Sequence, residues 1–316
     1  MKRIKVGAGF GLWRLGMPSA QAIASVAEQA ESWGLDSFWL SDHLIAPSPE
    51  LDVVATLSLI ASRTSTIKLG PSVLLLNLRH PLLVAKAFAS LDYLSNGRMV
   101  MAVGTGNNLA DYAACGIPVK NRGQRLDEGI AVLRRVWREP KASFHGQFYN
   151  FDNFTIEPRP VTRTNNDSGT IDIWVGGRSE AALKRTAKLA DGFFASFQTP
   201  VEYAESMQTI RRFAAEYGRA NARIESGLIL LCRIESSQER ALAQMRPMLD
   251  SMGQRAEQFL ERSVYGSPQD VLEQMERYVE VGLDKFVLWP IASPDAWSGQ
   301  VERIGREIAA HYARAN

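Results

Sequence analysis

The sequence predicts an α/β protein in which a single (β/α)8 TIM barrel with insertions spans residues 1–316. Short apolar runs typical of strands alternate with amphipathic runs typical of helices almost from end to end. Such alternation indicates a parallel sheet covered by helices. Eight strand-like runs in 316 residues favour a closed barrel over an open sheet, because a barrel needs roughly 250 residues. No linker or change in composition divides the chain.

The predicted strands are short and apolar, and the third is interrupted. It contains Gly70 and Pro71, which predict a bulge or bend. The eight predicted strands are 4–10, 36–41, 67–76, 98–103, 171–175, 192–196, 227–234 and 285–289.

The predicted helices carry apolar residues three and four positions apart, so that these residues share one face. Ser19 is a suitable cap for the first helix, and Pro81 is a suitable first residue for the third. The predicted helices are 19–33, 51–63, 81–95, 121–137, 179–189, 201–217, 238–252, 268–281 and 295–313.

The segment from about 143 to 170 departs from this alternation and is predicted to be an insertion. Aromatic residues alternate with turn residues over 143–160, which predicts a β-hairpin, and 162–170 is polar and loop-like. A lid and a dimer contact are both compatible with its composition.

Composition and charge exclude several classes of protein. The net charge is +2, and no basic stripe marks a nucleic-acid surface. No apolar run approaches the roughly 18 residues of a membrane span, and the N-terminal residues do not form a cleavable signal peptide. The two cysteines and four histidines lack the spacing of a metal site. We therefore expect a cytoplasmic protein that binds no metal, membrane or nucleic acid.

Candidate site residues begin at the second strand, because barrel enzymes carry their chemistry at the carboxyl ends of strands. Asp42 and His43 end that strand. A carboxylate beside an imidazole can position or protonate a substrate or cofactor atom. Adjacent residues of an extended chain face opposite sides, so Asp42 as a helix cap beside a structural histidine is the alternative.

Glycine-containing segments end the third and fourth strands. A bulge at Ser72-Val73 would push backbone toward the pocket, whereas a simple bend would only curve the barrel. The fourth strand ends in Gly104-Thr105-Gly106-Asn107, where glycine allows close approach of a ligand and asparagine offers donors and acceptors. This run lacks the third glycine of a dinucleotide fingerprint.

The fifth strand runs into Gly176, Gly177 and Arg178 immediately before a helix. Free amides at a helix N-terminus bind anions, and arginine can grip a phosphate. Ser196, at the end of the sixth strand, could donate a hydrogen bond to the same phosphate. The alternative is a tight turn with Ser179 as the helix cap.

Together these segments resemble the luciferase-like superfamily of flavin and deazaflavin oxidoreductases. The resemblance is strong over about residues 1–200. The matching stretches are WLSDHL (39–44), LGPSVLLLNLRHPLLVAKAFASLDYLSNGRMVMAVGTG (69–106), RGQRLDEGIAVLRRVWRE (122–139), FHGQFYNFDNFTIEPRPV (144–161) and IWVGGRSEAALKRTAKLADGF (173–193).

The resemblance implies a flavin-like ring over the strand ends. It implies a phosphate site at Gly176, Gly177 and Arg178 with Ser196 opposite, and a bulge at Ser72–Val73 against the ring. Other residues expected near the cofactor are Gly104, Thr105, Asn107 and Asp42. The third-strand bulge of this family often contains a non-proline cis peptide.

The Asp42-His43 pair resembles the branch that uses coenzyme F420, a deazaflavin. The FMN branch often carries Glu-His-His or another sequence there. Deazaflavin sugar-phosphate dehydrogenases carry a glutamate where this chain has Asn107, which argues against a sugar phosphate as substrate.

The sequence therefore predicts hydride transfer between F420 and a small organic substrate. His43 would act as acid, base or charge stabiliser, Asp42 would hold the cofactor or orient His43, and Asn107 would bind cofactor or substrate. Two alternatives are a two-component monooxygenase that uses reduced FMN, and a non-catalytic flavin-binding barrel. A homodimer and a reductase that supplies reduced cofactor are the expected partners. The outer wall of the pocket is expected near Trp13, Pro47, 143–160 and 289–297, and its aromatic character leaves the substrate open.

Overall fold

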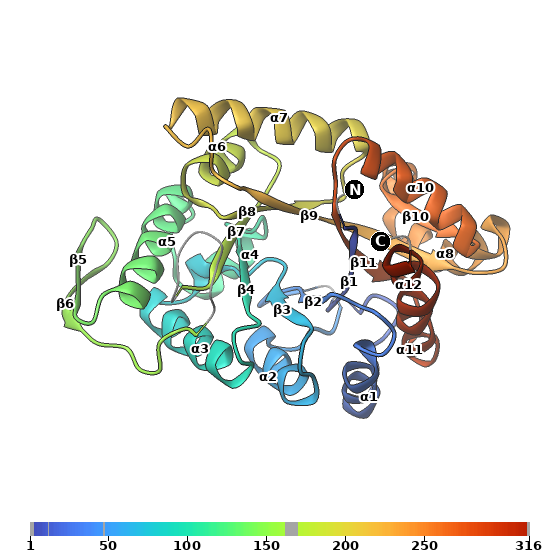
Figure 1. Ribbon diagram of the computed structural model, residues 1–316, viewed down its shortest axis with the longest axis horizontal. Helices are drawn as coiled ribbons and strands as arrows, with labels where there is room; N and C mark the ends of the chain where they lie inside the picture. The colour runs from blue at the N-terminus through green and yellow to red at the C-terminus, as the bar shows by residue number, and fades with distance from the viewer. Residues whose placement is uncertain (1–2, 12, 47, 162–169, 315–316) are drawn as a thin grey trace.

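Eight parallel strands form a near-closed barrel surrounded by helices in the computed structural model (Figure 1), which confirms the predicted fold class. The structure describes residues 3–11, 13–46, 48–161 and 170–314. The order around the barrel is β3-β2-β1-β11-β9-β8-β7-β4, and bridges from Leu69 to Met99 and from Leu74 to Val103 join β3 to β4. The barrel strands are β1 (Lys5–Phe10), β2 (Ser37–Leu40), β3 (Lys68–Pro71), β4 (Val100–Val103), β7 (Asp172–Gly176), β8 (Gly192–Ser196), β9 (Glu225–Ile234) and β11 (Lys285–Pro290).

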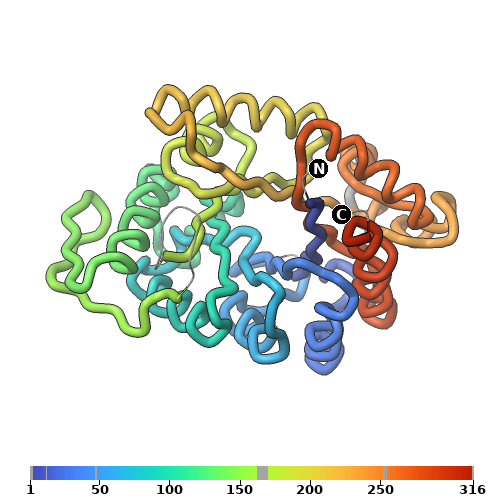
Figure 2. The backbone as a smooth tube through the Cα atoms, in the orientation of Figure 1, coloured from blue at the N-terminus to red at the C-terminus, as the bar shows by residue number. Residues whose placement is uncertain are grey.

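The first strand lies between the second and the last. Lys5 pairs with Lys285, and Ala8 pairs with Phe38. Figure 2 shows the dark blue N-terminal strand beside the red C-terminal part of the chain. The barrel therefore closes on this side through the two ends of the described sequence.

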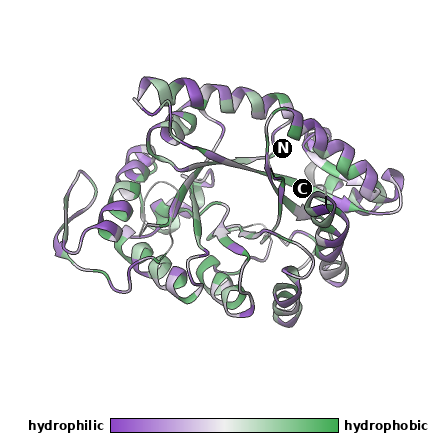
Figure 3. Ribbon diagram, in the orientation of Figure 1, coloured by the Kyte–Doolittle hydropathy of each residue, from purple (hydrophilic) through white to green (hydrophobic). Residues whose placement is uncertain are grey.

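Helices cover the outside of the barrel and turn their apolar faces inward, and in Figure 3 hydrophobic and hydrophilic segments alternate along them. Most begin at a side-chain cap, such as Ser19, Asp52 and Ser179, as expected for exposed helix starts. The helices are α1 (Ala20–Ala30), α2 (Val53–Arg63), α3 (Pro81–Leu94), α4 (Leu109–Ala114), α5 (Arg122–Arg138), α6 (Glu180–Leu189), α7 (Pro200–Glu216), α8 (Gln238–Met252), α9 (Ala256–Leu260), α10 (Pro268–Glu280), α11 (Pro294–Arg303) and α12 (Ala310–Arg314).

Aromatic side chains fill the interior of the barrel. Trp39 lies 5.6 Å from Trp174 and 4.5 Å from Phe194 between ring centroids. Trp289 lies across Gly9, where an added Cβ would be 1.3 Å from the indole nitrogen. Glycine is therefore required at this position so that the indole of Trp289 can enter the barrel mouth.

The structure differs from the sequence prediction in several short elements. The third strand ends at Pro71 and not at residue 76. A cis peptide bond joins Ser72 to Val73, and Leu74 then pairs with Val103 of β4 in an isolated bridge. A short strand that the sequence did not predict, β10 (Ser263–Gly266), pairs with the end of β9, and α4 and α9 were also missed. The predicted helix 295–313 contains a π-helical segment, Ile304–Ala309.

The insertion forms an antiparallel hairpin of β5 (Ala142–His145) and β6 (Asn150–Phe154), as the aromatic pattern predicts. The Glu128 carboxylate on α5 accepts three backbone N–H groups of the hairpin turn, from residues 147 to 149. The hairpin projects from the α5 side of the molecule (Figure 1). Residues 162–169 of the predicted insertion lie outside the described part of the chain.

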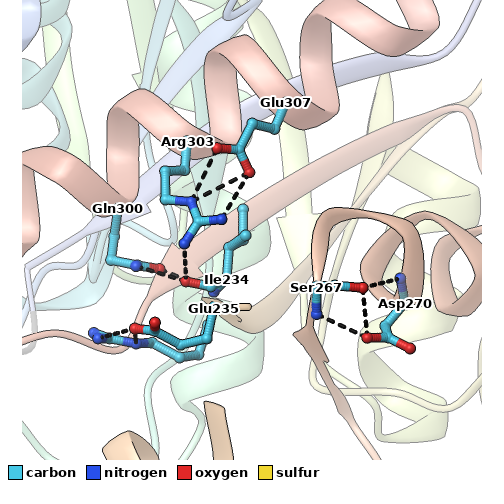
Figure 4. Close-up of polar contacts among 8 residues, drawn as sticks. Ile234, Glu235, Ser267, Asp270, Gln300, Arg303 and Glu307 are labelled. Carbon is cyan, nitrogen blue, oxygen red and sulfur yellow. Dashed lines mark hydrogen bonds and ion pairs between the residues drawn. The ribbon is translucent and has the colours of Figure 1, made fainter. Parts of the chain in front are cut away.

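The end of β9 is held by α11 through side chains that bond to its backbone (Figure 4). Gln300 accepts from the Ile234 N–H at 2.9 Å and donates to the Ile234 carbonyl at 2.9 Å. Arg303 donates to the same carbonyl at 2.8 Å. These bonds fix the strand end that borders the barrel mouth.

In the described ranges, every helix is too short or too polar to cross a bilayer.

Candidate active site

A cavity of about 1310 Å³, including the space open to solvent, lies at the carboxyl ends of the barrel strands. Every candidate residue named from the sequence lines it, although these residues come from five different strand ends. They are Asp42, His43, Ser72, Val73, Gly104, Thr105, Asn107, Gly176, Gly177, Arg178 and Ser196. The residues predicted from strand ends therefore line one continuous cavity.

One end of the cavity is the turn between β7 and α6. Gly177 has a φ of +129°, and a Cβ there would lie 2.8 Å from the Cβ of Ala182. Only glycine fits this turn without strain, and Ser179 caps α6 by accepting from the Ala182 N–H, as the alternative interpretation predicted. Arg178 is exposed at this end of the cavity, and Ser196 comes from the neighbouring strand β8. The arrangement is suited to an anionic group.

The bulge after β3 forms another wall of the cavity. The Val73 side chain lies between two glycines: a Cβ on Gly104 or on Gly176 would lie 2.6 Å from one of its methyl groups. These glycines therefore make room for Val73. Sequence reasoning assigned them to ligand approach, but their local function is to let the bulge enter the barrel mouth.

Two buried hydroxyl groups in the cavity lack a partner among the described residues. They are the Oγ atoms of Ser41 and Ser72. Buried polar groups in proteins are nearly always satisfied, so these hydroxyls indicate a ligand with polar atoms. An apolar wall, two unpartnered hydroxyls and a turn suited to an anion fit a ligand that carries both an apolar part and an anionic group.

His43 lies at the cavity with its imidazole held by Glu50. The Nδ1 atom is 3.1 Å from Glu50 Oε2 and 3.3 Å from Oε1. Because an ionised carboxylate can only accept, Nδ1 carries a proton and Nε2 is the atom available to a ligand. The hydrogen bond to Glu50 raises the pKa of His43, against the opposing effect of burial, and Asp42 and Asp111 add to the rise. The protonated imidazole is therefore favoured.

Asp42 lines the cavity but directs its carboxylate into the protein. Arg79 donates to it at 2.6 and 2.8 Å, and the Leu75 N–H donates at 2.8 Å. The proposal that Asp42 orients His43 is therefore corrected, since Glu50 makes that bond. Asp42 instead holds the chain that follows the bulge. A bidentate arginine pair of this kind is strong and directional.

Glu50 and Arg79 were not identified from the sequence as site residues. Glu50 lies in a loop seven positions after His43, and Arg79 follows a single 3-10 turn. Neither stands at a strand end, so only the tertiary structure brings them to the site. The sequence offered one signal for Glu50: it is an acidic residue without another assigned role, and it lies close in sequence to the candidate histidine His43.

The loop after β4 is fixed by α4. Tyr112 donates to the carbonyl of Thr105, and Asn77 donates to Tyr112 Oη at 3.1 Å. Asn107 is exposed at the cavity, whereas Asn108 caps α4. Asn107 is therefore free to meet a ligand while its neighbour is structural.

Part of the predicted outer wall borders a second cavity beside the first. Trp13, Trp289 and Trp297 line it. Pro47 lies outside the described residues, and the residues that line the two cavities include none of the hairpin over 143–160.

Comparisons with known proteins place this fold and site in a known family. The family model described as luciferase-like monooxygenase matches residues 5–285. An F420-dependent glucose-6-phosphate dehydrogenase from Kineococcus radiotolerans is 30% identical over 71% of this chain and 67% of its own. A 5,10-methylenetetrahydromethanopterin reductase from Methanopyrus kandleri is 22% identical over 96% of this chain and 98% of its own. The crystal structure of the monooxygenase RslO1 from Streptomyces bottropensis superposes with a TM-score of 0.84 at 20% identity, over 98% of this chain and 100% of its own.

The fold and the site thus define a barrel enzyme of the flavin and deazaflavin oxidoreductase type. The chain belongs to the luciferase-like monooxygenase family, and its relatives include F420-dependent glucose-6-phosphate dehydrogenases and a 5,10-methylenetetrahydromethanopterin reductase.

Proposed function

We propose that this protein is an F420-dependent oxidoreductase that transfers hydride to or from a small organic substrate. The observation that carries the proposal is that the turn at Gly177 and the imidazole of His43, which Glu50 holds, line one cavity. The curated relatives named as F420-dependent enzymes support the deazaflavin over FMN.

The chain offers a separate element for each part of such a cofactor. Gly176, Gly177 and Arg178 would hold the phosphate, with Ser196 opposite, through amides, guanidinium and hydroxyl. Val73 would contact the ring face. When bound, the deazaflavin supplies or accepts the hydride, and the protein supplies orientation and electrostatics.

His43 would hold or move the proton that accompanies the change in substrate oxidation state. Its Nε2 is the ring nitrogen left for a ligand, and Glu50 raises the pKa of the imidazole and orients it. Asp42 would act indirectly. Its bonds to Arg79 and Leu75 fix the wall of the cavity against which the ring of the cofactor would lie.

The discriminating experiment is a titration of the purified protein with F420 and, separately, with FMN. We expect tight binding of F420, measured by the change in its fluorescence, and weaker binding of FMN. Arg178→Ala should weaken F420 binding about tenfold, because it removes one charged contact to the phosphate, whereas the exposed Arg63→Ala should not.

Tight binding of FMN without F420 would reverse the assignment and favour the two-component monooxygenase. Binding of F420 without turnover of any substrate in a broad panel would favour a non-catalytic barrel. Light scattering in the same preparation tests the proposed homodimer.

A further inference from the structure

A second cavity adjoins the proposed cofactor cavity on the side of β9 and β11, and its lining is apolar. It contains about 650 Å³ of space, including its mouth. Among the described residues that line it, only Arg14 is charged, and none has a carboxylate, amide or hydroxyl side chain. Arg14 is exposed, so its charge is in contact with water at the mouth. The other lining residues are aromatic or aliphatic, among them Leu231 and Phe259.

Apolar side chains from four separate segments remain partly exposed around this cavity. They are Leu15 after β1, Phe197 after β8, Phe259 on α9 and Ala292 after β11. Single exposed apolar residues are common on protein surfaces, but a group of them around one hollow is typical of a binding site. Together with the lining, this indicates a hydrophobic ligand.

Phe197 lies at the boundary between the two cavities. It lines both of them, and its ring centroid is 5.9 Å from that of Phe259. Its φ is +49°, a left-handed conformation that a bulky residue rarely adopts. The Phe197 N–H donates to the Ile229 carbonyl at 3.0 Å. The next carbonyl along the chain, that of Gln198, accepts from Tyr278 Oη at 3.1 Å.

These bonds hold the backbone of Phe197 in its strained conformation. Strain of this kind persists where the surrounding structure imposes it, and it is concentrated at sites that bind or convert ligands. Its effect here is to place an aromatic ring where the two cavities meet.

We infer that Phe197 is a specificity-determining residue. It divides the barrel mouth into the cofactor cavity and an apolar compartment, the second cavity, which takes the hydrocarbon part of a neutral substrate. The word substrate rests on the proposed function, whereas the hydrophobic class rests on the lining alone. A charged or heavily hydroxylated group would lose its hydration in this compartment without gaining side-chain partners among the described residues.

The experiment measures the affinity of the full-length protein for 1-butanol, 1-hexanol and 1-octanol by ligand-observed saturation-transfer NMR. We expect affinity to rise about fourfold for each added methylene until the compartment is full, and then to level off. Hexanoate, which carries a carboxylate, should displace bound 1-hexanol less effectively than 1-octanol does. The alcohols should leave the F420 affinity of the unmodified protein unchanged, because the two ligands occupy different cavities.

Phe197→Gly tests the division directly, since glycine adopts the left-handed conformation without strain. The variant joins the two cavities, so affinity should level off at a longer chain, and 1-octanol should now weaken F420 binding. Ala292→Phe adds bulk to the wall of the compartment, so affinity should level off at a shorter chain. Phe154→Gly removes a half-buried ring of the hairpin that lines neither cavity, and it should change neither quantity.

Affinity that does not rise with chain length overturns the apolar compartment, and stronger displacement by hexanoate overturns the neutral substrate class. An unchanged chain-length profile in Phe197→Gly overturns the role of Phe197. F420 binding is also measured without alcohol. If the chain-length results are as expected and F420 fails to bind, the compartment stands and the proposed function fails. If F420 binds and affinity is independent of chain length, the proposed function stands and the compartment fails.

Discussion

His43 and Glu50 show how one contact can raise the pKa of a side chain that lines a cavity. The Glu50 side chain is only 4% exposed, whereas that of His43 is 31% exposed. The carboxylate is thus shielded from water while the imidazole faces the cavity. This asymmetry makes Glu50 a positioning group and leaves His43 to meet the ligand.

Glu50→Gln should move the pH dependence of turnover to lower pH. Glutamine keeps an acceptor for Nδ1 but removes the negative charge that raises the pKa of His43. If the protonated imidazole is required, kcat falls as the pH rises through the pKa of His43. In the variant this fall in kcat should therefore occur at lower pH. The measurement is the pH profile of kcat, together with the NMR titration of the His43 ring.

The control for this shift is Glu28→Gln, which removes an exposed carboxylate paired with Arg63 on the barrel exterior. It should leave the profile unchanged. An unshifted profile in Glu50→Gln would remove the pair from the mechanism.

His43→Ala should lower kcat about 10²- to 10⁴-fold, the range typical of a lost general acid or base. F420 affinity should stay nearly constant, because the anion-binding turn is unaffected. Steady-state kinetics and the fluorescence titration, run on one preparation, separate the two quantities. Unchanged turnover would exclude His43 as the proton-transfer group.

At the scale of elements, the link between β9 and α11 depends mainly on one side chain, that of Gln300. The backbone carbonyl of Ile234 accepts from two side chains, Gln300 and Arg303. The backbone N–H of Ile234 donates to Gln300. Loss of Gln300 therefore leaves the carbonyl bonded and the N–H without this partner. Gln300 is 5% exposed, so water cannot readily replace it.

Gln300→Leu should lower the free energy of unfolding by about 1–3 kcal/mol, the cost of one buried unsatisfied group. Urea denaturation followed by circular dichroism measures it. Gln269→Leu, at an exposed helical glutamine, is the matched control and should stay within about 0.5 kcal/mol of the parent. Equal stability of the two variants would contradict the role of Gln300.

The sequence predicted elements well where hydrophobic periodicity decides the structure. The strand predicted over 192–196 has the bounds of β8, and helix 238–252 has those of α8. The four-residue strand β10 was missed because so short a run carries no periodic signal. The third strand was predicted too long because apolar residues continue past Pro71, where the regular strand ends.

The site was predictable to the extent that it lies at strand ends. Ser196 and Arg178 are found by that rule, since their place follows from strand order alone. Glu50, Arg79 and the second cavity depend on loop paths and on side-chain packing, which a sequence does not display. For the same reason, the direction of the Asp42 carboxylate could not be predicted.

At the scale of the whole molecule, the two ends of the barrel differ in the residues that they carry. The carboxyl ends of the strands carry the cavity, while charged residues collect at the amino ends. Asp172 begins β7 there, near Asp191 and Glu225. Burial, followed by the repulsion of these two acids, raises the pKa of Asp172 to about 6. We therefore expect the residues on this face to affect stability and not catalysis.

Asp172→Asn should therefore stabilise the protein at neutral pH without changing activity. Because the folded-state pKa lies above the unfolded value of 3.8, the native state binds more protons between pH 4 and about 6. Stability then falls as pH rises through this window, and the cost of the charge is fully present above it.

Asparagine removes the charge, so the free energy of unfolding should rise by about 1–2 kcal/mol at pH 7.5 after allowance for partial solvent screening. At pH 4, where Asp172 is protonated in the folded protein, the gain should largely vanish. Urea denaturation at both pH values measures the difference, and kcat at pH 7.5 serves as the internal control. A gain of equal size at both pH values would show that the charge of Asp172 is not its source, because only an electrostatic effect follows the titration of this carboxyl group.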